Sequence, residues 1–113
     1  MHMYKRYSDK DRDEVRQQLK IVAEKIIIKK IDTITGLREL SCLWRFADYR
    51  EQHQIRAFLT DFNFTTARFP KGSSCQHYRK DYLADLQKQE QRFVQENWPQ
   101  ILKMSTKITH LPK

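Results

Sequence analysis

This sequence contains few of the residues that make tight turns or covalent cross-links. Its 113 residues include two glycines, three prolines and two cysteines. A protein built from many short strands needs a tight turn between strands, so the shortage of glycine and proline favours a few long helices. Cys42 and Cys75 form no Cys-x-x-Cys pair, and a disulfide framework is therefore not indicated.

Long apolar segments are also missing. The longest runs, such as residues 26–28, are far shorter than the roughly 20 residues that a membrane-spanning helix needs. Because no signal peptide is apparent either, we expect a cytoplasmic protein whose thiols are reduced. We interpret residues 1–7 as disordered or as a cloning remnant, and we exclude His2 from any site.

Basic residues outnumber acidic ones. The chain has 22 Lys and Arg against 14 Asp and Glu, a formal net charge of +8. Such a surplus favours an anionic partner, which could be nucleic acid, an acidic protein or a membrane surface, although the same charges can simply solvate the surface. Hydrophobic residues make up 39% of the chain, which at this length predicts one domain, residues 1–113, with a modest core.

The most apolar helical pattern lies between residues 31 and 46. Ile34, Leu37, Leu40 and Trp44 recur at steps of three and four, which predicts a helix over 32–48 with one continuous apolar stripe. Other apolar residues widen this stripe, so we expect the helix to be packed on at least two sides. Asp32 or Thr33 can cap its start.

Amphipathic patterns on both sides of this segment predict further helices. Apolar residues at helical spacing predict helices over 9–29, about 55–62, 75–96 and 97–109, the last one capped by Asn97. Residues 63–74 lack the pattern and contain Pro70 and Gly72, so they are predicted to form an irregular loop, and residues 110–113 are expected to fray. The predicted fold is all-α, a compact bundle of four to five helices.

A charged pair is predicted inside this bundle. Arg38 belongs to the apolar helix over 32–48. The stripe of the 75–96 helix has a gap between Leu86 and Phe93, where the core-facing position falls to Gln89 or Glu90, and Glu90 is the charged candidate. We expect Arg38 and Glu90 to meet as a partly buried ion pair, because an unpaired charge at either place would be costly. The alternative is that both side chains reach solvent.

Basic and aromatic residues are mixed between residues 62 and 80, where no acidic residue occurs. This mixture can neutralise phosphates and stack bases, and it is also enriched at protein interfaces. Tyr78 and Tyr82 nearby are more easily explained as core residues. The predicted partner-binding residues are Arg68, Phe69, Lys71, His77, Arg79 and Lys80.

No residue set indicates catalysis, a metal or a cofactor. Cys75 and His77 are the nearest approach to a reactive pair, but zinc requires more ligands and a thiol nucleophile requires a group that orients its base. We interpret them as part of a loop-to-helix junction and predict that the protein is not an enzyme. The lysines of the first helix do not indicate membrane binding either, because the apolar side of that helix is needed for the core.

Several of these segments together resemble a family of short helical bacterial proteins. The shared pattern is an Ile-rich segment, Gly36-x-Arg38, an aromatic loop that ends in Pro70-x-Gly72, a bulky aromatic at Tyr78, and a late Glu90. Proteins of this sort resemble immunity proteins, which bind and block a secreted toxin domain. In this chain Thr66, Ala67 and Arg68 stand where the pattern has acidic residues.

The resemblance implies a protein-binding function. We expect a toxin domain, or another acidic protein surface, to bind the 63–80 segment and the adjoining helix faces. The alternative is an accessory protein that uses the same basic residues to bind nucleic acid. The oligomeric state does not follow from the sequence.

Overall fold

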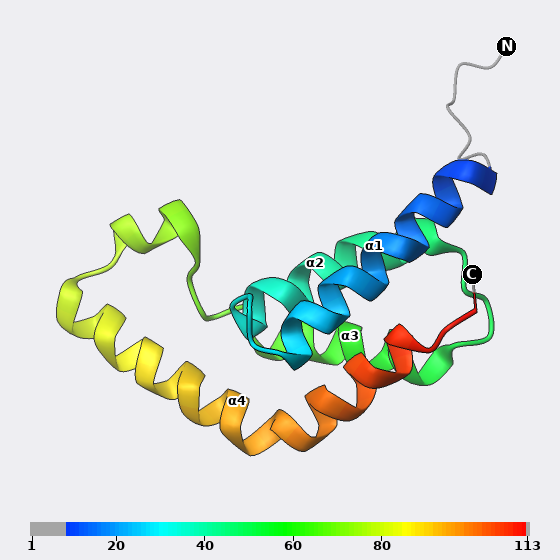
Figure 1. The fold of residues 1–113 in the computed structure, drawn as a ribbon. Helices are drawn as coiled ribbons and strands as arrows, with labels where there is room; N and C mark the ends of the chain where they lie inside the picture. The colour runs from blue at the N-terminus through cyan, green and yellow to red at the C-terminus, as the bar shows by residue number, and fades with distance from the viewer. Residues whose placement is uncertain (1–8, 113) are drawn as a thin grey trace, which may run out of the picture.

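The computed structural model describes residues 9–112, and the segment 1–7 considered above lies outside them. The chain forms an all-α bundle of four helices, as predicted, and no strand occurs in the described part (Figure 1). The helices are α1 (Asp9–Ile27), α2 (Thr33–Ala47), α3 (His53–Thr65) and α4 (Lys80–Thr109), and a 3₁₀ helix, η1 (Gly72–His77), precedes α4. None of the helices within residues 9–112 is long and apolar enough to span a bilayer.

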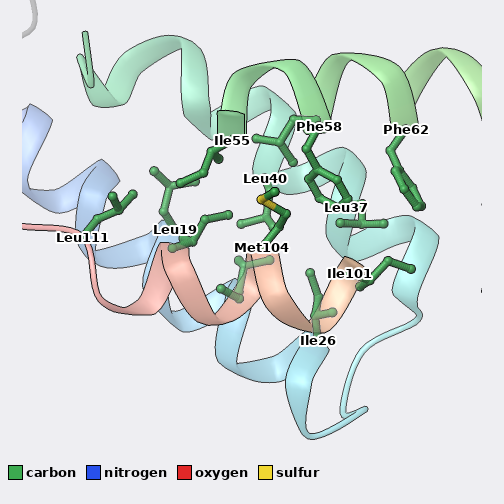
Figure 2. Close-up of a cluster of buried hydrophobic side chains, with 14 of the residues drawn as sticks. Leu19, Ile26, Leu37, Leu40, Ile55, Phe58, Phe62, Ile101, Met104 and Leu111 are labelled. Atoms are coloured by element: carbon green, nitrogen blue, oxygen red, sulfur yellow. The ribbon is translucent and has the colours of Figure 1, made fainter. Parts of the chain in front are cut away.

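The hydrophobic core lies where α1, α2, α3 and the second half of α4 meet (Figure 2). Each helix contributes side chains that are almost completely buried, among them Leu19, Leu40, Ile55 and Ile101. Full burial of one such side chain is worth about 1.5–3 kcal/mol. As the sequence pattern predicted, α2 is packed on two sides, by α1 and α3. The expected packing of the 75–96 helix on α2 is wrong, because α4 packs mainly against α1.

The first helix ends two residues earlier than predicted, at Ile27. Lys29 adopts a left-handed backbone conformation with φ 58°. The backbone N–H groups of Lys29 and Lys30 donate to the carbonyls of Ile26 and Lys25. This is the hydrogen-bond pattern that commonly terminates helices, although glycine usually fills the left-handed position.

Gly36 brings α1 close to α2. A Cβ at this position would lie 2.6 Å from Cγ1 and 2.9 Å from Cδ1 of Ile26. A glycine inside a helix costs about 1 kcal/mol relative to alanine. That cost is explained here by the close contact, which a side chain would prevent.

Side chains satisfy both ends of α2. Asp32 is the N-cap, and its carboxylate accepts from the backbone N–H of Thr35 at 3.0 Å, as predicted. At the other end the guanidinium of Arg16 donates to the carbonyls of Ala47 and Asp48, at 2.6 and 2.8 Å. These carbonyls have no partner within the helix, so α1 supplies the cap of α2.

The fourth helix differs most from the prediction. We expected a break at Asn97, but α4 runs continuously through Pro99 to Thr109. Pro99 has no N–H to donate to the preceding turn, and such prolines bend helices without always ending them. Figure 1 shows that α4 bends, so that its second half packs against the core while its first half extends away. Of the segment 110–113 that we expected to fray, Leu111 is buried against the core, and residue 113 lies outside the described residues.

Candidate functional site

The connection between α3 and η1 is held by Arg38. This side chain projects from α2 and its guanidinium donates to the carbonyls of Thr66 and Phe69, at 2.9 and 2.8 Å. Both acceptors belong to almost completely buried residues, and an unpaired buried carbonyl would be destabilising. One arginine therefore shapes the loop that begins after α3.

Lys71 holds the same loop from its other end. Its ammonium lies 2.5 Å from the carboxylate of Glu90 and 3.1 Å from that of Asp32. Glu90 is partly buried, with 13% of its side chain exposed, and so it does fill the gap in the α4 stripe. The direct ion pair between Arg38 and Glu90 that we expected is not formed. Arg38 bonds to carbonyls instead, and Glu90 pairs with Lys71.

The pKa of Asp32 reflects this arrangement. Partial burial acts to raise the pKa of this carboxyl, but the hydrogen bonds from Thr35 and Lys71 and the charge of Lys71 outweigh it, so the pKa lies below its ordinary value. Asp32 is thus both the cap of α2 and an anchor for the loop. We call Arg38, Lys71, Asp32 and Glu90 the loop clamp.

The predicted partner-binding residues fall into two groups. Phe69 is only 1% exposed and packs near Phe93 in the interior, and Lys71 belongs to the loop clamp. Phe69 is buried, so we correct the expectation that it contacts a partner. Lys71 is partly exposed, and its contact with a partner stays a prediction. The other four are exposed side chains, which are Arg68, His77, Arg79 and Lys80.

Two tyrosines that we expected in the core are at the surface. Tyr78 and Tyr82 are 37% and 54% exposed. Their rings stack on each other with centroids 5.8 Å apart. They lie where η1 joins α4, on the part of the chain that extends away from the other helices in Figure 1. Since few core contacts reach this part, the helical spacing of the tyrosines does not bury them.

A groove lies between α2 and α3, and the sequence reasoning missed it. This α2–α3 groove has a volume of about 710 Å³. Its lining residues include three arginines and three aromatic residues, which are Trp44, Arg45, Tyr49, Arg50, Arg56 and Phe64. The arginines lie outside the 63–80 segment, on α2, α3 and the loop that joins them, and the packing of α2 on α3 places all three along one groove.

One wall of the α2–α3 groove is fixed by Tyr49. Its ring stacks on that of Trp44 at 5.4 Å and lies under the guanidinium of Arg16 at 4.1 Å. Its hydroxyl donates to the carbonyl of Pro112. Burial raises the pKa of Tyr49, although the nearby charges of Arg16 and Arg12 oppose that shift. The hydroxyl therefore stays protonated and remains a hydrogen-bond donor at neutral pH.

Two smaller hollows are linked to the groove by shared lining residues, the second of them only through the first. The loop hollow, about 420 Å³, lies beside Arg38 and Pro70, and it shares Asn63 with the α2–α3 groove. The tyrosine hollow, about 510 Å³, lies between His77 and Tyr82, and it shares Tyr78 with the loop hollow. The three depressions thus follow one another from α2 and α3 to the start of α4.

Guanidinium groups and aromatic rings are the main groups that line these depressions. Among residues 9–112 no three His, Cys, Asp or Glu side chains gather closely enough to hold a metal ion. Cys75 is partly exposed and His77 is exposed, at the junction between η1 and α4. What the surface does provide is guanidinium groups and aromatic rings, which are prominent in protein interfaces.

Comparison of the chain with models of protein families, with curated proteins and with solved structures found no match in any of the three.

Proposed function

We propose that this chain is a non-enzymatic protein-binding module. The observation that carries the proposal is the lining of the three linked depressions by Arg, Trp, Tyr and Phe. Trp, Tyr and Arg are the residues that most often contribute large shares of binding energy at protein interfaces. Four of the residues that the sequence predicted to bind a partner are exposed, and all four lie in the 63–80 segment. They are Arg68, His77, Arg79 and Lys80.

The specific form of this proposal is an immunity protein, which binds a bacterial toxin domain and blocks it. Such an inhibitor needs a stable scaffold and a complementary surface, and it needs no catalytic group. A net charge of +8 would accelerate association with an acidic toxin surface. The loop clamp supports the proposal physically, because a preformed loop loses less conformational freedom on binding.

The experiment is co-expression with the product of the neighbouring open reading frame. We expect the chain to restore growth and to co-purify with that product as a stoichiometric complex. A double variant, Arg79→Ala with Tyr82→Ala, should weaken both effects. A matched control at Lys103, which is exposed on the far part of α4, should not. The immunity function would be contradicted if growth is not restored and no complex forms in solution.

Nucleic-acid binding is the second candidate, and the exposed tyrosine pair favours it. Tyr78 and Tyr82 lie next to His77, Arg79 and Lys80, and aromatic rings beside basic groups bind single-stranded nucleic acid. The affinity for nucleic acid should then fall linearly with salt concentration on logarithmic axes. Binding of random oligonucleotides at physiological salt, without any protein complex, would favour this candidate over the first.

A further inference from the structure

The α2–α3 groove contains positive charge that the fold does not use. Arg45 and Arg56 are exposed, and no carboxylate among the described residues pairs with either guanidinium. Arg50 pairs with Asp48 at 3.2 Å, but its side chain is still 85% exposed. Asp48 is the only acidic residue that lines the groove. Three cations therefore face one anion.

Apolar surface lies between these charges. Phe64, at one end of the groove, is 86% exposed, the most exposed large apolar side chain in the described part of the chain. Trp44 is partly exposed, and the buried Leu59 also lines the groove. The exposed apolar surface of Phe64 and Trp44 is unfavourable in water, and the free energy falls when another apolar group covers it.

The cations of the groove are all arginines. No lysine lines it, although lysines are common on α1 and α4. Protein interfaces are enriched in arginine and depleted in lysine, whereas phosphate backbones are neutralised by both. Arginine also pairs with carboxylates through two parallel hydrogen bonds. The composition thus favours a carboxylate-bearing protein segment over a nucleic acid.

We propose that the α2–α3 groove binds a segment of the partner protein in which acidic residues flank an apolar one. The apolar side chain would cover Trp44 and Phe64, and the carboxylates would pair with Arg45 and Arg56. This inference rests on the proposed protein-binding function and names the chemistry of the partner segment. Of these anchoring residues, Trp44, Arg45 and Arg56 lie outside the 63–80 segment that the sequence singled out, and Phe64 lies within it.

Trp44 allows a direct test, because it lines the groove and is one of two tryptophans. In a Trp98→Phe background its fluorescence reports on the groove alone. The probe is a short synthetic peptide of repeated Glu-Leu-Glu segments, and the control peptide has Gln in place of each Glu. We expect the acidic peptide to shift the Trp44 emission to shorter wavelength in a saturable way. We expect the Gln peptide not to do so.

Two double variants distinguish the effect of contacts in the groove on peptide affinity from the effect of the protein's overall charge. Arg45→Ala with Arg56→Ala should weaken peptide binding about tenfold for each arginine removed. Lys25→Ala with Lys103→Ala removes the same charge elsewhere on the exposed surface and should change affinity less than about twofold. Anisotropy of a labelled peptide with the chain that retains Trp98 gives the same comparison if Trp98→Phe disturbs the fold.

Three outcomes would overturn the inference. The first is equal affinity for the two peptides, and the second is an equal loss of peptide affinity in the two double variants. The third is that oligothymidylate binds more strongly than the acidic peptide, with the same dependence on Arg45 and Arg56. The proposed function has a separate readout, since growth rescue requires no peptide. If the Arg45→Ala, Arg56→Ala variant still rescues growth fully, the chain binds its partner protein but does not use the groove to do so.

Discussion

Replacing Arg38 by alanine tests how the loop after α3 is held. The substitution removes two hydrogen bonds, to the carbonyls of Thr66 and Phe69. Leaving a buried acceptor without its charged donor costs about 1.5–3 kcal/mol. Arg38 itself is partly exposed, so water can reach the vacated space and the lower end of the range applies. We expect a total loss of about 2–4 kcal/mol in the free energy of unfolding.

Thermal unfolding followed by circular dichroism measures this loss. For a chain of this length 1 kcal/mol corresponds to about 4 °C, so the Tm should fall by about 8–16 °C. Arg38→Lys keeps the charge but lacks the planar fork that reaches two carbonyls, and it should restore only part of the stability. A Tm within a degree of the unmodified protein would refute the role given to Arg38.

A double-mutant cycle distinguishes the observed contacts from the pair that we first expected. The energetic coupling between Lys71→Ala and Glu90→Gln should be about 1 kcal/mol or more, because the two charged groups touch. The coupling between Arg38→Ala and Glu90→Gln should be smaller. A larger coupling for Arg38 than for Lys71 would show that the direct pair forms in solution.

Three further predictions concern the core and the cap of α2. Gly36→Ala should lower the free energy of unfolding by about 1–2 kcal/mol despite the better helix propensity of alanine, because its Cβ would overlap Ile26. Equal or higher stability of this variant in urea unfolding would contradict the close contact. Phe69→Ala should lower the free energy of unfolding by about 3–5 kcal/mol. Phe64→Ala, at an 86% exposed residue, should change it by less than about 0.5 kcal/mol. Similar losses of stability in the two variants would contradict the burial of Phe69. The lowered pKa of Asp32 means that its ionised form stabilises the fold above its ordinary pKa, near 4, and that this contribution disappears as the pH falls through the lower folded value. Asp32→Asn retains the cap but lacks the charge, so its stability deficit at pH 7 should shrink on acidification, and a deficit that does not depend on pH would rule out the charge contribution.

The sequence by itself was sufficient for α1, α2 and α3 and for much of the core. Apolar residues at steps of three and four predicted α1, α2 and α3, because a helix must bury one face whatever it packs against. The cap at Asp32 was predictable for a similar reason, since a side chain caps the helix that directly follows it. The partial burial of Glu90 also followed from its position in an apolar stripe.

Features that join distant segments required the tertiary structure. Arg38 could be recognised as needing a partner, but its acceptors are backbone carbonyls 28 and 31 residues away, and backbone groups leave no mark in the sequence. The spacing of Tyr78 and Tyr82 suggested burial, yet the bend of α4 leaves its first half away from the core. The course of α4 through Pro99 was likewise not predictable, because a proline can either end a helix or bend it.

The α2–α3 groove shows most clearly the difference between what local sequence predicts and what the tertiary structure decides. Arg45 and Arg56 are ordinary surface residues in the sequence, and nothing in their spacing connects them. They share a surface only because the apolar faces of α2 and α3 pack against each other and hold their polar edges side by side. Local spacing therefore determined which faces are buried, and the packing of those faces decided which exposed side chains became neighbours.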